Sequence, residues 1–217
     1  MSILIHNRRD PQPQRSFVSS RLRGDVLQNP SLPPRRNQTF RKRELIPLPQ
    51  DILWRLEAGT VRTFTLAEDG ALITLGLWGV GDVVGSALAQ IRPHQAECLS
   101  TVNVSPLVTV HSAYLNQILL AHLHQSQELL SIRSGPMQQR LLQLLDWLAL
   151  KFGRSTDQGI HLNIRLTHQE IADILGTTRV TVTRLLSHLE SEKYLSWICG
   201  RILLPIPQQR LSITGQQ

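Results

Sequence analysis

The residues best suited to chemistry in this 217-residue sequence lie in the stretch RLTHQEIADILGTTRVTVTRLLSHLE, from Arg165 to Glu190. Its second half places Arg179, Val180 and Arg184 on the outward face of a helical pattern. Arginine can donate two hydrogen bonds to N7 and O6 of guanine, and valine can contact the methyl group of thymine. The face is therefore suited to reading the edges of DNA bases.

Two short helices are expected to position this face. Thr167 and Glu170 have the spacing of a capping box, in which each side chain bonds the other residue's backbone amide. The helix that follows ends at Gly176, where a tight turn needs a left-handed backbone. Thr177 or Thr178 can then cap the second helix. The pattern predicts two helices joined by a short turn.

The packing positions agree with a helix-turn-helix. Ala172 supplies a small residue where the two helices come closest, and Val182 follows Gly176 at the point where the second helix must dock. An ordinary helical corner with a solvated charged face would not require this combination. The predicted DNA-contacting residues are Thr167, Gln169, Thr178, Arg179, Val180, Thr181, Thr183, Arg184, Ser187 and Arg201.

Arg201 enters that set because of the segment beyond the second helix. Residues 194–208, YLSWICGRILLPIPQ, have strand character around Cys199 and Gly200, which predicts a hairpin wing with Arg201 at its tip. A wing tip commonly lies over the sugar-phosphate backbone of DNA.

The first half of the chain has β character. Residues 60–66 and 71–78 are short β-rich runs joined by an Asp-Gly turn, a strong hairpin signal. Two further runs, 98–104 and 106–113, flank Ser105 and Pro106, where we expect a break. Strands with such frequent turns are typical of an antiparallel sandwich or barrel.

Helical periodicity begins after Ser112. A stripe with three- and four-residue spacing offers a packing face, and within a small chain its partner could be the same helix of a second copy. Gly135 and Pro136 break the helix, and residues 137–153 form a second, densely apolar helix. The stripe consists of Leu115, Leu119, His122, Ser126, Leu129 and Arg133.

The N-terminal residues differ from the rest in charge. The chain has a formal net charge of +7, and residues 1–43 carry ten basic residues against Asp10 and Asp25. This stretch has almost no hydrophobic periodicity, which predicts a flexible basic arm. The arm could contact DNA phosphates, or it could be a solvated tail. Its composition also fits a transit peptide, although no amphipathic helix is evident.

Composition limits the cellular setting. Hydrophobic residues make up 41% of the chain, and no run approaches the length of a membrane span or of a secretory signal. Cys98 and Cys199 are too few and too far apart for a disulfide framework or a four-cysteine metal site. We therefore expect a soluble cytoplasmic protein with reduced thiols, no cofactor and no membrane partner.

Taken together, these motifs resemble the Crp-Fnr family of bacterial transcription regulators. The resemblance covers about residues 44–208, and GVGDVVG (residues 79–85) is similar to the family's Gly-Asp-x-x-Gly turn. It implies an α+β fold: a basic arm (1–43), a cyclic-nucleotide-binding-like β-roll (44–112), a dimerisation helix (113–134) and a winged helix-turn-helix (135–217). It further implies a homodimer on palindromic double-stranded DNA, with RNA polymerase as a partner.

The recognition segment is especially similar to that of the NtcA nitrogen-control subfamily. The shared run here is Arg179 to Arg184, and the resemblance implies half-sites like the GTA and TAC of that subfamily. The effector half departs from the family, because Ser86 stands where cyclic-nucleotide binders have a glutamate and Glu97 stands near their phosphate-binding pair. A carboxylate repels a phosphate, so we expect no binding of cyclic AMP.

Other effectors remain open. A 2-oxoacid would need an arginine, and Glu97 again occupies that place, although Arg92 or His94 could reach a pocket by another route. The candidate effector-binding residues are Gly85, Ser86, Ala87 and Arg92. Two cysteines cannot hold an iron–sulfur cluster, and His122 and His124 point in different directions on a helix, so no metal site is predicted.

The sequence predicts a DNA-binding regulator rather than an enzyme. No Ser-His-Asp, phosphate-loop or paired-carboxylate arrangement stands out. The alternative is a ligand-sensing protein whose helix-turn-helix serves a protein partner instead of DNA.

Overall fold

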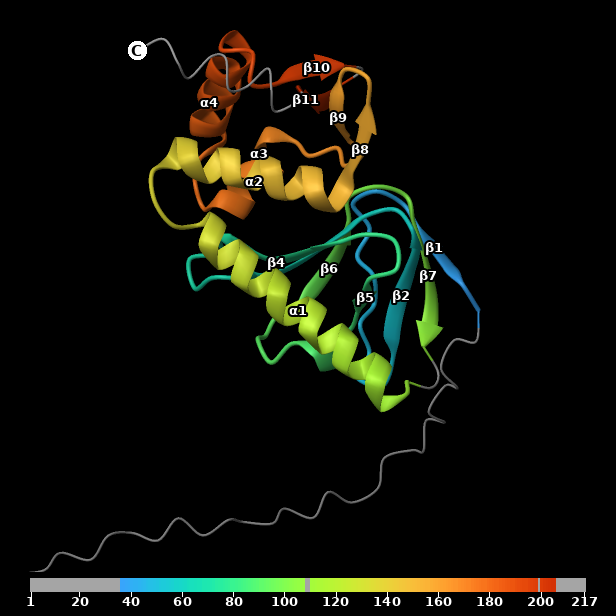
Figure 1. The fold of residues 1–217 in the computed structure, drawn as a ribbon. Helices are drawn as coiled ribbons and strands as arrows, with labels where there is room; N and C mark the ends of the chain where they lie inside the picture. Colours follow the sequence, from blue (N-terminus) through green and yellow to red (C-terminus); the bar gives the residue numbers. More distant parts are fainter. Residues whose placement is uncertain (1–35, 108–109, 199, 206–217) are drawn as a thin grey trace, which may run out of the picture. The chain divides into compact units, whose positions relative to one another are not determined.

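The computed structural model describes residues 36–107, 110–198 and 200–205, all of which belong to one compact unit. Residues 1–35, most of the predicted basic arm, lie outside the described residues. The described chain begins with a β-rich half, continues through a long helix, and ends in a half with three helices and a small sheet (Figure 1).

The β-rich half consists of two antiparallel sheets. One has the strand order β1-β7-β2-β5 and the other β4-β3-β6. Inward-facing side chains such as Trp54, Leu56 and Val104 are buried between them. The elements are β1 (Gln38–Phe40), β2 (Leu53–Ala58), β3 (Val61–Leu66), β4 (Leu72–Trp78), β5 (Val83–Val84), the short 3₁₀ helix η1 (Ser86–Leu88), β6 (Gln95–Cys98) and β7 (Val102–Leu107).

Two predicted turns are confirmed in this half. Gly70 has a left-handed φ of 81° between β3 and β4, and Asp69 Oδ1 accepts a hydrogen bond from the amide of Ala71 at 2.9 Å. In the turn before β5, Asp82 Oδ2 accepts from the amide of Gly79 at 2.9 Å. Local turn chemistry therefore fixes both the β3–β4 hairpin turn and the turn from β4 to β5.

Two sequence predictions are corrected in this half. The basic arm does not extend to residue 43, because β1 pairs with β7 through Gln38, Thr39 and Phe40. The break predicted at Ser105 and Pro106 is absent, since β7 continues to Leu107. β1 pairs with β7 only up to Val104. Among the described residues no strand pairs with that side of β7 at Pro106, so the missing N–H of the proline leaves no ladder hydrogen bond unmade there.

The second half follows a long helix, α1 (Ser112–Ile132). Its elements are α2 (Met137–Phe152), β8 (Gly153–Thr156), β9 (Gly159–Leu162), α3 (His168–Leu175), α4 (Arg179–Ser191), β10 (Ser196–Ile198) and β11 (Arg201–Leu204). The strands form one antiparallel sheet in the order β10-β11-β9-β8. A leucine- and isoleucine-rich core joins α2, α3 and α4.

One face of α1 packs on β4. Only some residues of the predicted stripe lie on this face. Ile118, Leu129 and Ile132 are buried there, and the side-chain amide of Gln125 bonds both the amide and the carbonyl of Leu77. The His122 ring stacks on Trp78 at 4.0 Å between centroids and donates to the carbonyl of Val83. Leu129 and His122 therefore hold α1 to its own roll, whereas Leu119 lies exposed.

Candidate DNA-binding site

The predicted capping box is present at the start of α3. The amide of Glu170 donates to Thr167 Oγ1 at 3.2 Å, and the amide of Thr167 donates to Glu170 Oε2 at 2.6 Å. These bonds satisfy amides that the first turn of the helix leaves without partners. They fix where α3 begins and so set the direction of the helix pair.

The turn between α3 and α4 also matches the sequence prediction. Gly176 ends α3 in the left-handed region, with φ 64°, and its amide donates to the carbonyl of Ala172. Thr178 caps α4 by accepting from the amide of Thr181 at 3.2 Å. Ala172 and Val182 are both fully buried, so α4 docks on α3 through them. The pair has helix-turn-helix geometry.

The outward face of α4 carries side chains that the protein core does not use. Arg179, Arg184 and Ser187 are exposed, and Val180 has 59% of its surface exposed. Among the described residues, neither arginine forms an ion pair. The face therefore offers two guanidinium groups and one apolar side chain to an external partner.

The threonines of the predicted site have a different role. The Thr183 hydroxyl donates to the carbonyl of Arg179 at 2.9 Å and so accepts from His168 Nδ1 at 2.8 Å, a link from α4 back to α3. Thr178 and Thr181 bond each other at 2.9 Å. These hydroxyls hold the start of α4 in place; the sequence predicted the cap at Thr178 but not the link from Thr183 to His168.

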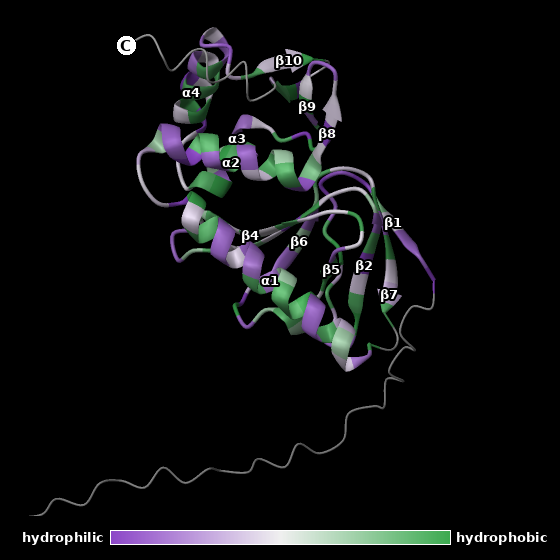
Figure 2. Cartoon of the chain, viewed as in Figure 1, coloured by the Kyte–Doolittle hydropathy of each residue, from purple (hydrophilic) through white to green (hydrophobic). Residues whose placement is uncertain are grey.

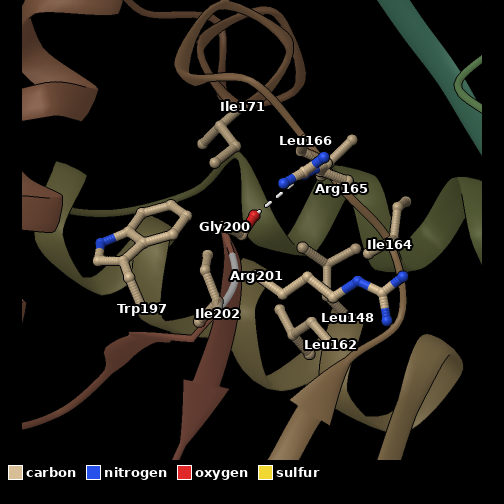
Figure 3. A pocket seen from close by; sticks show the side chains of 10 residues that line it. All are labelled: Leu148, Leu162, Ile164, Arg165, Leu166, Ile171, Trp197, Gly200, Arg201 and Ile202. Atoms are coloured by element: carbon tan, nitrogen blue, oxygen red, sulfur yellow. Dashed lines mark hydrogen bonds between the residues drawn. The ribbon is translucent and has the colours of Figure 1, made fainter.

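The predicted wing is a hairpin of β10 and β11. Arg201 is exposed at the first position of β11, and Gly200 has a left-handed φ of 70° beside it. Arg165, which sequence reasoning did not select, donates from Nε to the carbonyl of Gly200 at 3.2 Å (Figure 3). A side chain on Gly200 would collide with the Arg165 guanidinium. The wing tip therefore carries two arginines.

Beneath the wing lies an apolar seam. Leu148, Leu162, Ile171, Trp197 and Ile202 meet there around a cavity of about 10 Å³ (Figure 3). A space of this size holds at most one water molecule. The seam therefore packs the wing against α2 and α3 and is not a ligand site.

A buried arginine joins α3 to the roll. Arg62 on β3 is 5% exposed, and its guanidinium lies 2.6 Å from Glu97 Oε2 and 2.9 Å from Asp173 Oδ2. The other oxygen of Asp173 accepts from Gln169 Nε2 at 2.7 Å. Glu97 therefore balances Arg62 instead of facing an effector, and the bonded chain reaches Gln169 at the start of α3.

The predicted effector residues do not meet in a pocket. Ser86 is buried with its hydroxyl donating to the carbonyl of Pro49, and Ala87 is exposed. Arg92 is exposed and donates to the carbonyls of Ala89 and Ile91 in its own loop. Gly85 approaches Leu53 closely. Backbone carbonyls therefore engage the Ser86 hydroxyl and the Arg92 guanidinium, and effector binding by these four residues stays a prediction.

A cavity does exist between the roll and α1, with other residues around it. Its volume is about 440 Å³, and Trp78, Ile91, His94, Leu119 and His122 line it. Burial lowers the pKa of both His94 and His122, and Arg92 lowers that of His94 further. Neutral imidazoles, apolar side chains and the uncharged polar residues Thr63, Gln90 and Ser126 line this cavity, so none of the described residues around it carries a charge to bind an anion strongly.

The remaining side-chain chemistry is structural. Cys98 is a free, buried thiol, and burial raises its pKa to about 12, which keeps it unreactive. Within the described ranges, no group of three or more His, Cys, Asp or Glu side chains could hold a metal ion. Cys199 lies outside the described residues.

The arrangement of capped helix pair, exposed basic recognition face and arginine-tipped wing defines a winged helix-turn-helix DNA-binding protein. The Crp-like helix-turn-helix domain matches residues 139–209. The regulatory protein CysR of Synechococcus elongatus is 36% identical over 166 residues, which cover 73% of this chain and 78% of that protein. The global nitrogen regulator of a Nostoc species is 30% identical, covering 73% of this chain and 80% of that protein.

The fold is shared with solved structures. A CRP-family transcriptional regulator from Thermus thermophilus superposes with a TM-score of 0.67 at 27% identity, covering 82% of this chain and 97% of that one. The chain therefore belongs to the Crp-Fnr family of transcription regulators. It is a DNA-binding regulator and not an enzyme, as the sequence predicted. In the part of the chain that the structure describes, no helix is long and apolar enough to cross a membrane.

Proposed function

We propose that the protein acts as a homodimer on palindromic promoter DNA and reads bases through the outward face of α4. The observation that carries the proposal is the exposed pair Arg179 and Arg184 flanking Val180, on a helix whose opposite face is fully docked. Arg179, Val180 and Arg184 enter the major groove and set the sequence preference. Similarity to the global nitrogen regulator supports half-sites resembling GTA and TAC.

The other predicted contacts position the protein on the DNA. Thr167 and Gln169 at the start of α3, Ser187 on α4 and Arg201 on the wing contact sugars and phosphates. We assign Arg165 to the same group, since it holds the wing tip. Thr178, Thr181 and Thr183 act by fixing the start of α4.

An electrophoretic shift experiment tests this function. The full chain should retard a palindromic duplex with GTA and TAC half-sites at a protein concentration well below that needed for a scrambled duplex of the same length. Equal retardation of both duplexes would refute sequence-specific binding. No retardation of either would favour a helix-turn-helix that serves a protein partner.

The dimer is proposed to form through α1. Four leucines of α1 are 46–67% exposed: Leu119, Leu120, Leu123 and Leu130. Figure 2 shows hydrophobic residues along the whole of α1. Burying a leucine contributes about 1.5–3 kcal/mol, so two such helices packed together would stabilise a dimer. A two-fold axis would place the recognition helices about 34 Å apart, one DNA turn, which selects a palindrome.

Leu123→Glu is expected to yield monomers and weaken DNA binding, because a charge would be buried in that interface. Leu150→Glu is a matched control, since Leu150 is 88% exposed on α2. Sedimentation velocity distinguishes the two variants. If Leu123→Glu sediments as the same dimer as the control, the interface lies elsewhere. Leu129 is unsuitable for this test, because it is buried against the protein's own core.

We infer that cyclic AMP is not the effector and that the protein binds DNA without an added ligand. The cavity beside α1 lacks a cationic side chain among its lining residues, and a cyclic phosphate needs one. Titration calorimetry with cyclic AMP is therefore expected to show no heat of specific binding.

RNA polymerase is the proposed protein partner. Retention of polymerase on promoter DNA only when the regulator is present would support this proposal.

A further inference from the structure

A side-chain relay connects the roll to the start of the helix-turn-helix. It consists of Glu97 on β6, Arg62 on β3, and Asp173 and Gln169 on α3. Arg62 Nη2 donates to Glu97 Oε2 at 2.6 Å, and Arg62 Nη1 donates to Asp173 Oδ2 at 2.9 Å. The second oxygen of Asp173 accepts from Gln169 Nε2 at 2.7 Å. Every bond joins two side chains, so the orientation of Gln169 depends on a residue of the roll.

The inner end of the relay is buried, and its outer end lies in water. Arg62 is 5% exposed, the side chains of Glu97 and Asp173 are 19% and 16% exposed, and Gln169 lies on the surface. Water competes little for the inner bonds, which are therefore stronger than the same bonds on the surface. Because Arg62 binds both carboxylates, Asp173 presents its second oxygen to Gln169 in a fixed direction. An exposed glutamine without such a partner would move between several rotamers.

The backbone of α3 does not depend on the relay. Arg133 donates from Nε to the carbonyl of Ile174 and from Nη2 to the carbonyl of Thr74, both at 3.0 Å, and so joins the end of α3 to β4. Arg140 donates from Nη2 to the carbonyl of Leu175. These bonds hold the C-terminal end of the helix, and the capping box fixes its start. The relay therefore adds control of one side chain, at its exposed end.

We propose that Arg62 is a positioning residue for DNA binding, which acts through Asp173 to hold Gln169 in the rotamer that contacts a phosphate. This role rests on the proposed function, which places Gln169 on the DNA backbone. The side-chain nitrogen of Gln169 has two N–H groups, of which Asp173 accepts one. No hydrogen bond within the described ranges uses the other, so it can donate to a phosphate. A side chain that is already ordered loses little entropy when it binds.

NMR of the full chain without DNA tests whether Arg62 orders Gln169. The triple variant combines Arg62→Met, Glu97→Gln and Asp173→Asn, which removes the cation of the relay and leaves no carboxylate uncompensated. Nitrogen relaxation should show an ordered side-chain amide at Gln169 in the wild type and a mobile one in the triple variant. The variant Gln169→Ala identifies the signal. An equally ordered amide in the wild type and the triple variant would overturn the proposal.

A matched control removes a different ion pair between the roll and a helix. Lys151 on α2 lies 3.1 Å from Asp82, so Lys151→Met combined with Asp82→Asn also removes a cation and its carboxylate. The amide of Gln169 should stay ordered in this control, because neither residue belongs to the relay.

A thermodynamic cycle on DNA affinity tests what the relay does. Gln169→Ala should weaken binding to the preferred palindrome and to random DNA alike, by about tenfold, because it removes a hydrogen bond to a charged phosphate. The triple variant should also weaken both. Adding Gln169→Ala to it should cause little further loss, because the two changes remove the same contact. Fluorescence anisotropy measures the affinities. Wild-type affinity in the triple variant, or losses that add, would overturn the proposal.

Two further variants complete the cycle. Arg201→Ala, on the wing, is the matched control, and its loss should add in full to that of the triple variant. Circular dichroism confirms that each variant is folded. If the triple variant is not, Arg62→Lys replaces it, because an ammonium keeps the charge but loses the fork that holds both carboxylates.

The role of Arg62 and the proposed function fail in different ways. If the wild type binds neither duplex, the proposed function is refuted and the phosphate contact with it, while the NMR measurement still decides whether Arg62 orders Gln169. If the wild type binds DNA and the triple variant binds it equally well, the proposed function stands and the role of Arg62 is refuted.

Discussion

The arginines at the two surfaces of the helix-turn-helix differ in what they contact. Arg179 and Arg184 on α4 are exposed, and in the described part of the chain they have no carboxylate partner. Arg62, on strand β3 of the roll where it faces α3, is buried between Glu97 and Asp173. An exposed arginine keeps its donors for a partner, whereas a buried arginine must be neutralised within the protein. Removing the first kind should change DNA binding, and removing the second should change stability.

The largest effect is expected for Arg62→Met. The substitution leaves the partly buried carboxylates of Glu97 and Asp173 without their cation, and breaking a buried ion pair typically costs about 3–5 kcal/mol. Urea denaturation, followed by circular dichroism, measures the free energy of unfolding. Adding Glu97→Gln and Asp173→Asn to Arg62→Met should restore most of the loss, because no uncompensated charge remains. If Arg62→Met lowers the free energy of unfolding by less than about 1 kcal/mol, the ion pairs of Arg62 with Glu97 and Asp173 do not stabilise the fold.

Arg184→Ala tests the other side of the comparison. It should weaken binding to the preferred palindrome by about 1–3 kcal/mol, and it should have little effect on random DNA, because it removes a base contact. The free energy of unfolding should stay unchanged, since Arg184 makes no ion pair with the described residues. Fluorescence anisotropy with both duplexes measures the difference. Equal weakening on specific and random DNA would place Arg184 on the phosphates instead.

The histidines beside α1 extend the comparison to pH. Burial holds the pKa of His94 and His122 below the usual 6.5, so in the folded protein they resist protonation. The stability that they contribute is complete above pH 6.5 and is lost as the pH falls below that value, because the unfolded chain then binds more protons. Nearby Asp82 and Lys151 act on His122 in opposite directions.

The expected outcome is a fall in unfolding free energy between pH 7 and pH 5 that is smaller in the double variant His94→Gln, His122→Gln. Urea denaturation at each pH provides the measurement, and the carboxylates contribute equally to both proteins. An identical pH dependence in the wild type and the double variant would show that these histidines are not protonated on unfolding.

The two halves of the chain also differ in how well the sequence predicted them. The capping box of Thr167 and Glu170, the left-handed Gly176 and the docking Val182 were all predicted, because each depends on residues within a few positions of one another. β2 was missed, although Trp54 and Leu56 alternate with the outward-facing Arg55 and Glu57, a usable strand signal. The continuation of β7 through Pro106 depends on where β1 stops pairing, which no local pattern records.

The site predictions follow the same division. The outward face of α4 could be predicted, since helical periodicity decides which side chains point away from Val182. α1 has apolar residues on two faces, and periodicity alone cannot tell which one packs on the roll, so Leu119 and Leu129 were assigned to one stripe. The pairings of Arg62 with Asp173 and of Arg140 with α3 join residues far apart in the sequence, and neither was predicted.

The basic N-terminal residues give the smallest and least specific expected effect. Residues 1–35 contain six arginines and two aspartates, and residue 36 precedes β1, so deleting 1–35 spares the roll. If these arginines contact DNA, they contact phosphates, and the deletion should weaken all sequences alike and flatten the salt dependence by about 0.9 for each lost contact. Fluorescence anisotropy over a range of salt concentrations measures the slope. The specificity ratio should remain unchanged, in contrast to Arg184→Ala, where affinity and specificity fall together. If the deletion changes neither affinity nor slope, residues 1–35 are a solvated tail, and base reading and phosphate contact both belong to the winged half of the chain.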